Sequence, residues 1–599
     1  MAKHNGRAAI DDWWTLWPRL FEDELAAYAR LGIAPRIIYE RNGLLILEAD
    51  WPVLGRPASM LLRIGYSPLH PFCRPAVAAP AEVFERHQNP LSRELCLLTQ
   101  ETGQWNSKQL VADFIQERLD HLLRALAARA EGRWGDAAKL EEQVADPLMP
   151  YFVGTEEEDS IILFDGQMPV PTGGHGIMEV VYTPRPTPRN PDAFEGVLRQ
   201  LKTSAGTICG KRFGLPNELT DAQLVTGRWV KFTPPRTADA EDMLRLAENE
   251  LARQAVLQAA SVQKVIDATR GPISLTGIVF PEETEYGSAK KNGAGWLFLA
   301  TRRAFANGKA GAATTRLVLG ERAGKDDIFA RLPVANSLLG KKALVVGCGA
   351  IGSFTGLELS RAGVGEIAFL DHDTVQPGNS LRWPLGRPVW GSAKAVALAN
   401  FVMANYPWTK VRAFGCRLGS AIADINGVPQ DQQGNVLTPV FNALRNADVV
   451  VDCSASLEVQ HALSFYCRTF GVPYVMGYAT LGVAGGVVAR FLPGSESCLV
   501  CLHEHWNDAK HIPKPRVDDA GIVVPTGCNG PTFTGGGFDL QEVALEIVRS
   551  VVGILSEGKY DTGAWPIAIL ELKNESGGRI LPYWEGYGCS PHQKCCGAK

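Results

Sequence analysis

The feature that most constrains the fold is an apolar run that leads directly into closely spaced glycines. Residues 343–346 are apolar, and Gly347, Gly349 and Gly352 follow as G-x-G-x-x-G. This pattern predicts a buried strand that opens onto the N-terminus of a helix. The free N–H groups and the positive dipole end of such a helix favour a bound phosphate. We therefore expect a nucleotide-binding fold in this part of the chain.

Length and composition limit the other possibilities. A chain of 599 residues is too long for one hydrophobic core, so we expect several domains. Its 46% hydrophobic and 21% charged residues are typical of globular proteins. The formal net charge of −4 gives no general attraction to nucleic acid or anionic membranes. Without a signal-peptide pattern or a run long enough to span a bilayer, we expect a cytoplasmic protein with no nucleic-acid or membrane partner.

Strand-like and helix-like patterns alternate in residues 332–599. Such alternation predicts an α/β fold with a largely parallel, doubly wound, Rossmann-like sheet. The expected strands are residues 343–346, 366–370, 449–453, 474–477 and 487–491.

The polar residues that follow the second of these strands indicate which nucleotide is bound. Asp371 comes nineteen residues after the last glycine, where a dinucleotide site places an acid on a ribose. Asp373, Asn379, Arg382 and Lys394 follow it. A nicotinamide site has no evident use for two cations, whereas a triphosphate that loses pyrophosphate needs its negative charge held. These residues favour ATP.

Asp452 ends a further apolar strand of this region. Ligands bind beyond the carboxyl ends of the strands in doubly wound sheets, and Mg²⁺ prefers carboxylate oxygens. We expect Asp452 to bind Mg²⁺. The alternative is a carboxylate that only caps the strand end.

Together these motifs resemble the adenylation domain of the ubiquitin-activating, ThiF and MoeB superfamily, over residues 332–580. The resemblance implies that Asp371 holds the ribose of ATP and that Asp452 binds Mg²⁺. It also implies that the phosphates are contacted by Asn379, Arg382 and Lys394.

Two further residues bear on this resemblance. Trp383 stands where many members of the superfamily carry a glutamine. Such enzymes usually work as dimers in which the partner lends an arginine, and Arg331, just before the first strand, is the candidate. The resemblance therefore implies a homodimer.

A cysteine near the C-terminus is a candidate nucleophile. An acyl adenylate can pass its acyl group to a thiol, which keeps the bond energy for another transfer. Cys528 lies in a glycine-rich segment, residues 524–537, where its neighbours are polar rather than apolar. Similarity to activating enzymes that carry their own catalytic cysteine makes it the first choice.

The N-terminal region, residues 1–146, has the pattern of an α+β domain. Helices are expected over residues 11–31 and 107–131. Strands are expected at residues 36–39, 44–49 and 60–64. The order predicts an antiparallel sheet flanked by helices.

A second cysteine lies in this region. His87-Gln-Asn89-Pro90, Cys96 and Trp105 resemble the ubiquitin-conjugating fold, in which a His-Pro-Asn turn precedes a cysteine and a tryptophan follows it. The resemblance implies that Cys96 is catalytic and that Asn89 stabilises the oxyanion. The alternative is that Cys96 fills the core between two leucines.

Residues 147–331 carry no chemical motif. Strands are expected at residues 177–182, 228–232 and 273–280, and helix from 238 to about 269. This pattern indicates a mixed α/β domain that serves as a linker or scaffold.

Four further cysteines are candidate zinc ligands: Cys498 and Cys501 as C-x-x-C, and the adjacent pair Cys595 and Cys596. Four thiolates suit a closed structural zinc site. An ordinary buried pair and a loose tail are the alternatives, because adjacent residues seldom bind one ion comfortably.

The whole arrangement resembles the bacterial fusions of activating and conjugating domains found in CBASS anti-phage operons. That resemblance implies that the C-terminus of a CD-NTase cyclase is adenylated, captured on Cys528, passed to Cys96 and joined to an unknown amine. The alternatives are a ThiF/MoeB-like activator of a sulfur carrier, an NAD-dependent oxidoreductase, and a binding scaffold without activity.

Overall fold

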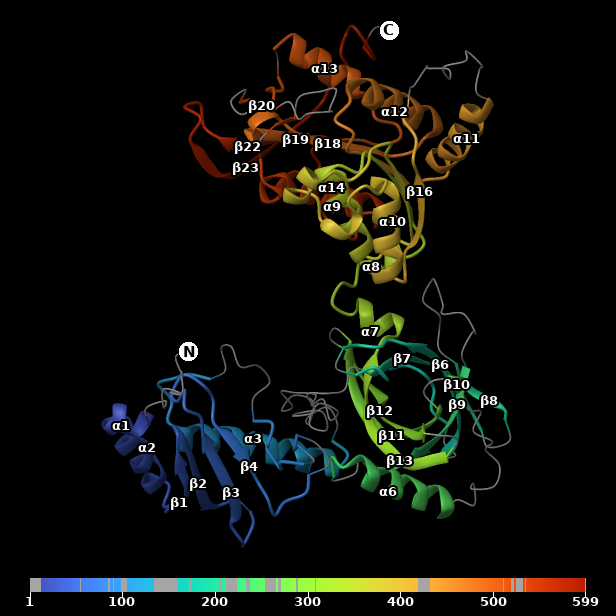
Figure 1. Ribbon diagram of the computed structural model, residues 1–599. Coiled ribbons are helices and arrows are strands. Elements are labelled where there is room, and N and C mark those ends of the chain that lie inside the picture. Colours follow the sequence, from blue (N-terminus) through green and yellow to red (C-terminus); the bar gives the residue numbers. More distant parts are fainter. Residues whose placement is uncertain are drawn as a thin grey trace, which may run out of the picture. The chain divides into compact units, whose positions relative to one another are not determined.

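The computed structural model (Figure 1) divides into two compact units, residues 1–213 with 219–328 and residues 214–218 with 329–599. The structure describes residues 12–53, 55–84, 87–89, 91–97, 105–133, 160–171, 174–188, 190–203, 206–211, 224–232, 237–253, 265–267, 271–286, 289–306, 309–418, 431–509, 511–518, 522–523, 532–533 and 535–597. The domain boundary expected between residues 146 and 147 lies outside these ranges.

The N-terminal part is an antiparallel meander with helices before and after it. Its strands are β1 (Arg36–Arg41), β2 (Leu44–Trp51), β3 (Met60–Tyr66) and β4 (Ala76–Ala78), paired in that order. Its helices are α1 (Trp13–Leu16), α2 (Pro18–Arg30) and α3 (Val111–Ala130). This is the predicted α+β order. The single helix expected over residues 11–31 is wrong, because Pro18 lacks an N–H and disfavours helical geometry at Trp17.

The central part is a β-barrel. Its strands are β5 (Ile161–Phe164), β6 (His175–Pro184), β7 (Phe194–Lys202), β8 (Ile208–Lys211), β9 (Leu224–Lys231), β10 (Val265–Asp267), β11 (Gly271–Tyr286), β12 (Ala289–Ala306) and β13 (Lys309–Arg322). The sheet runs from β11 through β12, β13, β5, β7 and β6 to β9, and β9 pairs with β11 to close it (Figure 1).

One helix, α6 (Ala240–Arg253), packs on the outside of this barrel against β13, β11 and β9. The helix expected to continue to about residue 269 is therefore too long, because β10 occupies Val265–Asp267. Strands dominate the described residues of this part, which was expected to be a mixed α/β domain. Aromatic residues such as Trp229, Trp296 and Phe298 fill the barrel core.

The C-terminal unit is built on an eight-stranded sheet in the order β16-β15-β14-β17-β18-β19-β22-β23. The strands are β14 (Lys342–Val346), β15 (Glu366–Leu370), β16 (Lys410–Phe414), β17 (Val449–Asp452), β18 (Tyr474–Ala479), β19 (Gly485–Phe491), β22 (Ile567–Lys573) and β23 (Arg579–Tyr587). The five strands β16, β15, β14, β17 and β18 are parallel to one another. The remaining strands β19, β22 and β23 pair antiparallel. The predicted doubly wound sheet is confirmed.

Helices cover both faces of this sheet. They are α8 (Ala335–Leu338), α9 (Ala350–Arg361), α10 (Lys394–Asn405), α11 (Asp431–Arg445), α12 (Leu457–Phe470), α13 (Leu499–Asn507) and α14 (Gly537–Leu555); α7 (Lys325–Phe329) precedes them. A short hairpin, β20 (Ile522–Val523) with β21 (Thr532–Phe533), lies outside the main sheet.

The strand order of the main sheet reverses at β14, which lies between β15 and β17. At such a reversal the two connections leave the sheet in opposite directions, and a crevice opens at the carboxyl ends of the strands.

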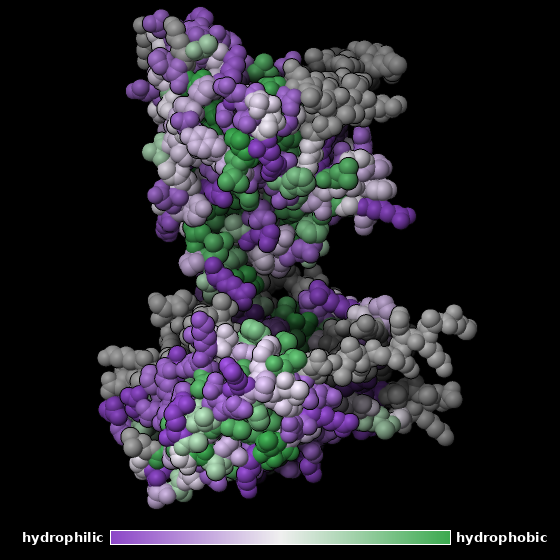
Figure 2. All heavy atoms as spheres, turned by 90° about the vertical axis from the view of Figure 1, so that its left-hand side faces the viewer, coloured by the Kyte–Doolittle hydropathy of each residue, from purple (hydrophilic) through white to green (hydrophobic). Residues whose placement is uncertain are grey.

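The distribution of hydrophobic residues on the surface is relevant to membrane association. Hydrophilic and hydrophobic residues are interspersed on the face shown in Figure 2. Among the described residues, no helix is both long and apolar enough to cross a bilayer.

Candidate functional site

The glycine turn after β14 has the close packing that only glycine permits. Gly347 has φ +81°, and a Cβ there would lie 2.6 Å from the backbone of Ser454. A Cβ on Gly352 would lie 1.8 Å from the carbonyl oxygen of Gly347. Gly349 caps α9 and has no atom within 4 Å of its would-be Cβ. The first and third glycines therefore hold the turn against the protein, and the second leaves open space at the helix N-terminus.

Asp371 connects this turn to the segment after β15. Its Oδ2 accepts the N–H of Cys348 at 2.7 Å, and its Oδ1 accepts the N–H of Asp373 at 2.7 Å. The carboxylate is thus fixed beside the glycine turn, where the sequence placed a ribose-binding acid. Ribose binding by Asp371 stays a prediction.

The two expected cations lie at the same end of the sheet. Lys394 begins α10, and its Nζ lies 3.0 Å from Oδ2 of Asp373. The side chain of Lys394 is 12% exposed and that of Asp373 is 57% exposed. Arg382 is half-buried, and this burial lowers the pKa of its guanidinium. Asn379 accepts the N–H of Gln376 at 2.9 Å, so its side-chain oxygen caps the turn that carries Arg382.

A cavity of about 230 Å³ joins these elements. It is lined by Gly349, Ala350, Ile351, Asn379, Arg382, Trp383, Lys394, Cys453, Ser454, Ala455, Tyr478, Ala479 and Leu540. The lining contains two cations and, among the described residues, no carboxylate. A helix N-terminus and two cations in one cavity suit an anionic ligand such as a polyphosphate.

Trp383 has a role that the sequence did not reveal. It is 4% exposed, and its Nε1–H donates to the carbonyl oxygen of Cys348 at 2.8 Å. The indole therefore ties the segment that carries Arg382 to the glycine turn. The sequence shows a tryptophan within a polar segment. Such a residue predicts packing against the protein, but it does not identify the hydrogen-bond partner of the indole.

Asp452 does not face this cavity as expected. It is 0% exposed, its carboxylate accepts three hydrogen bonds from Ser454 and Tyr474, and burial raises the pKa of its carboxyl group. These contacts do not fit an open Mg²⁺ ligand. Mg²⁺ binding by Asp452 stays a prediction from the sequence, and the structure places this side chain in the protein interior.

Comparisons with known proteins agree with this geometry. Residues 326–557 match the model of the ThiF family. The chain is 45% identical over 589 residues to the uncharacterized protein y4oA of Sinorhizobium fredii, and the match covers 98% of each chain. The chain belongs to the y4oA family.

Two other relatives match a smaller share of the chain. The ATP-dependent ubiquitin transferase-like protein Cap2 of Enterobacter hormaechei is 29% identical over 39% of this chain and 36% of its own length. The sulfur carrier protein ThiS adenylyltransferase of Bacillus subtilis is 27% identical over 31% of this chain and 49% of its own length.

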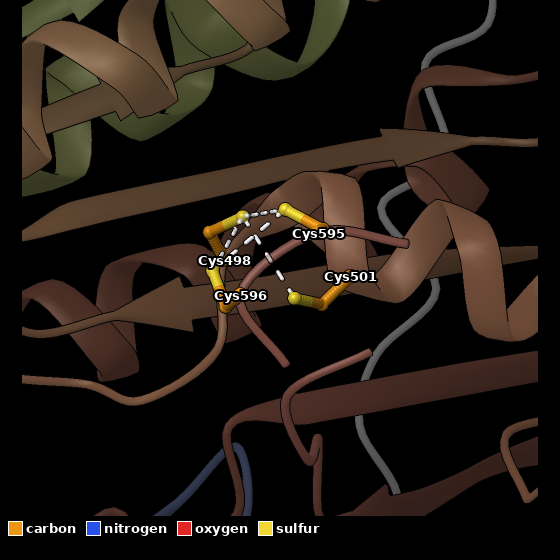
Figure 3. A group of neighbouring side chains, drawn as sticks. All are labelled: Cys498, Cys501, Cys595 and Cys596. Atoms are coloured by element: carbon orange, nitrogen blue, oxygen red, sulfur yellow. Dashed lines mark hydrogen bonds between the residues drawn. The ribbon is translucent and has the colours of Figure 1, made fainter. Parts of the chain in front are cut away.

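The four cysteines of the candidate zinc site come together at the N-terminal end of α13, where Cys498 caps the helix and Cys501 lies in its first turn (Figure 3). The sulfur of Cys498 lies 3.5 Å from that of Cys595, 3.6 Å from that of Cys596 and 4.0 Å from that of Cys501. All four ligand atoms lie within 4.8 Å of one another. Sulfurs of a tetrahedral zinc site, with Zn–S of about 2.3 Å, are separated by about 3.8 Å. The four thiols fit zinc.

Neighbouring groups are suited to a thiolate cluster. Arg468 places Nη1 3.1 Å from the sulfur of Cys596, and the backbone N–H of His592 donates to the sulfur of Cys501 at 3.4 Å. Both contacts favour negatively charged sulfur, and hydrogen-bond donors that touch metal ligands in this way commonly stabilise metal binding.

Two further residues expected to act in the ThiF region have roles that stay predictions. Cys528 lies outside the described residues, and its role stays a prediction. Arg331 is exposed in this chain, and its role in a partner's site also stays a prediction.

The N-terminal candidates lie in one compact turn. The N–H of Cys96 donates to the carbonyl oxygen of His87 at 2.8 Å, which pairs the cysteine with the His87–Asn89 segment. The Oδ1 of Asn89 accepts the N–H groups of Leu91 at 2.8 Å and Ser92 at 3.0 Å. The structure thus gives the Asn89 carbonyl a turn-forming role. Its role at an oxyanion stays a prediction.

Two further contacts describe the surroundings of Cys96. Burial, and secondarily the Glu94 carboxylate, raise the pKa of the Cys96 thiol, while Arg74 opposes them. Trp105 donates its indole N–H to the carbonyl oxygen of Pro71 at 2.8 Å, which anchors the loop between β3 and β4. The Cys96 side chain is partly exposed, whereas its chain neighbours Leu95 and Leu97 are buried in the core.

Proposed function

We propose that the ThiF domain uses ATP to adenylate a carboxylate at the end of a protein or peptide. The observation that carries the proposal is the cavity in which Arg382 and Lys394 lie beside the free helix N-terminus at Gly349. The printed names of two partial relatives, Cap2 and the ThiS adenylyltransferase, support an ATP-dependent adenylation of this kind.

In this reaction a carboxylate oxygen attacks the α-phosphorus of ATP. The bond between that phosphorus and the oxygen bridging to the β-phosphate breaks, and pyrophosphate leaves with the electron pair. The product is an acyl adenylate. Arg382 and Lys394 would hold the negative charge on the phosphates as it develops. Lys394 would exchange its contact with Asp373 for the nucleotide, since both are within reach of one Nζ.

The later steps complete the proposal. The acyl group passes to the sulfur of Cys528 as AMP leaves, and then by thiol exchange to Cys96. An amine, for example a lysine, takes it as an amide and releases the Cys96 thiol. The acyl donor would be the C-terminus of a CD-NTase cyclase, in an anti-phage system. Similarity to Cap2, over part of the chain, supports this assignment.

Two assembly features belong to the same proposal. The enzyme acts as a homodimer in which Arg331 of each subunit serves the other subunit's nucleotide. The four-cysteine cluster holds a structural Zn²⁺ that fixes the C-terminal segment to α13, as its sulfur separations support.

The first experiment is exchange of labelled pyrophosphate into ATP, with the purified chain and a candidate cyclase. Exchange that requires the cyclase's C-terminal carboxylate and is lost in Lys394→Gln supports adenylation. No exchange with any carboxylate donor contradicts it, and binding of a nicotinamide dinucleotide would favour an oxidoreductase.

A second experiment separates conjugation from activation of a sulfur carrier, the function printed for the ThiS adenylyltransferase. Thioester adducts are trapped under non-reducing conditions in the wild type, Cys528→Ser and Cys96→Ala. Conjugation predicts ATP-dependent adducts on both thiols and loss of the Cys96 adduct in Cys528→Ser. A sulfur-carrier activator predicts full acyl transfer in Cys96→Ala.

A further inference from the structure

Asp452 is held by hydrogen bonds on both of its carboxylate oxygens. Its Oδ1 accepts the N–H of Ser454 at 2.9 Å and the Oγ–H of Ser454 at 2.7 Å. Its Oδ2 accepts the hydroxyl of Tyr474 at 2.9 Å. Tyr474 lies on the adjacent strand β18 and is itself fully buried. These bonds satisfy a buried carboxylate entirely within the protein.

The loop that Asp452 holds forms one wall of the cavity. Cys453, Ser454 and Ala455 all line it. The backbone of Ser454 also packs against the glycine turn, so closely that a Cβ on Gly347 would lie 2.6 Å from it. A shift of Ser454 would therefore move either the cavity wall or the turn that leads to the helix N-terminus.

The cavity offers no protein carboxylate for a divalent cation among its described lining residues. Ala455 is the loop residue that lines the cavity in the left-handed backbone region, with φ 53°. Aspartate and asparagine adopt that region more readily than alanine does. Within residues 452–455, the one carboxylate is that of Asp452, which is buried, and position 455 carries an apolar methyl.

We propose that Asp452 is a positioning residue that fixes the 453–455 loop against the glycine turn and does not bind Mg²⁺. This inference rests on the proposed ATP-binding function of the cavity. It implies that Arg382 and Lys394 neutralise the negative charge of the phosphates. Any divalent cation would then enter the site already bound to the nucleotide.

The test measures the dissociation constant of ATP by calorimetry, in buffer with excess Mg²⁺ and in buffer with EDTA. Asp452→Ala and Tyr474→Phe each remove part of the same hydrogen-bond network. Both should weaken ATP binding about tenfold, which corresponds to about 1.4 kcal/mol, because each variant loosens the hold on the 453–455 loop. The weakening should be the same in the two buffers. Asp452→Asn, which retains a carbonyl oxygen for Ser454, should recover part of the affinity.

The contrary result is specific. If Asp452 holds Mg²⁺, its removal weakens ATP binding only when Mg²⁺ is present, and Tyr474→Phe has no effect. Variants that bind ATP as the wild type does in both buffers would also overturn the inference. If Asp452→Ala does not fold, Tyr474→Phe and Ser454→Ala decide the question by the same comparison.

A gain-of-site variant gives an independent readout. Ala455→Asp places a carboxylate on the cavity wall, so it should bind Mn²⁺ without nucleotide, as followed by the loss of the free Mn²⁺ spin-resonance signal. The wild type and Asp452→Asn should bind Mn²⁺ equally weakly at this loop. Weaker Mn²⁺ binding in Asp452→Asn than in the wild type would contradict the inference. Failure of the wild type to bind ATP at all would instead contradict the proposed function.

Discussion

The indole of Trp383 donates to the carbonyl oxygen of Cys348 at 2.8 Å, across the segment that separates the glycine turn from Arg382. Replacing Trp383 with phenylalanine keeps most of the apolar contact and removes the donor. A buried carbonyl left without its partner costs on the order of 1–3 kcal/mol, so we expect ATP to bind about tenfold more weakly. Calorimetric titration with ATP measures the change.

A second tryptophan in the same unit provides the control. Trp390 is 43% exposed and donates its indole N–H to the Ser380 hydroxyl at 2.7 Å. Trp390→Phe removes an indole bond of similar length away from the glycine turn. It should leave ATP affinity within twofold of the wild type, as expected for a solvent-accessible bond. Equal losses in the two variants would show that the Trp383 bond has no special connection to the nucleotide.

Lys394 should matter more for the reaction than for folding. Its Nζ pairs with the exposed Asp373 carboxylate, and the residue lines the cavity. Lys394→Gln should slow ATP–pyrophosphate exchange roughly 100-fold, the effect typical of one lost transition-state donor. Its thermal midpoint should change by no more than about 2 °C, because exposed ion pairs contribute little.

Lys410→Gln is the matched control for that variant. Lys410 is exposed at the start of β16 and is not among the cavity-lining residues. Its exchange rate should equal that of the wild type. Similar rates for Lys394→Gln and Lys410→Gln would remove the phosphate role assigned to Lys394.

Short-range patterns predicted the elements of the nucleotide fold well. Strand β15 lies at the residues expected, because its apolar run ends in a polar cluster at Asp371. The barrel was harder to predict. The pair Lys290-Lys291, for example, belongs to β12 and lies opposite Glu285 and Thr284 of β11. Polar strand residues of this kind conceal the period-two pattern on which strand prediction depends.

The site was less predictable than the fold, because the direction of a side chain and its long-range contacts cannot be inferred from local sequence. The sequence placed Asp452 at the right strand end, but it contained no signal that Tyr474 would draw the carboxylate inward. The sequence offered Cys498 and Cys595 as ligands of one zinc site on residue type alone, and only the fold shows that these residues, 97 positions apart, meet. Both relationships depend on how neighbouring strands and the C-terminal segment pack, which local periodicity does not record.

The four-cysteine cluster predicts one bound zinc per chain. Removing the metal should lower the thermal midpoint of the C-terminal unit by roughly 5–10 °C, because metal binding contributes directly to folding free energy. Atomic absorption of the purified chain and calorimetry with and without a chelator measure these quantities. Cys498→Ser should lose the metal.

The nearby thiol of Cys589 is the control for the cluster. It does not belong to the tetrad, and burial raises its pKa to about 11. Cys589→Ser should retain one zinc per chain. A metal-free wild type, or equal zinc loss in Cys589→Ser and Cys498→Ser, would contradict the site.

The thiol of Cys96 should react slowly with alkylating reagents. Burial and the Glu94 carboxylate raise the pKa of this thiol, so the folded domain holds its proton more tightly than the unfolded chain does. Its contribution to stability is therefore present at neutral pH and is lost as pH rises above the ordinary thiol range. At pH 7.5 iodoacetamide should alkylate Cys96 several-fold more slowly than the exposed Cys73. Glu94→Gln should speed the Cys96 reaction alone, as followed by peptide mass spectrometry; equal rates for both thiols in the wild type would contradict the raised pKa.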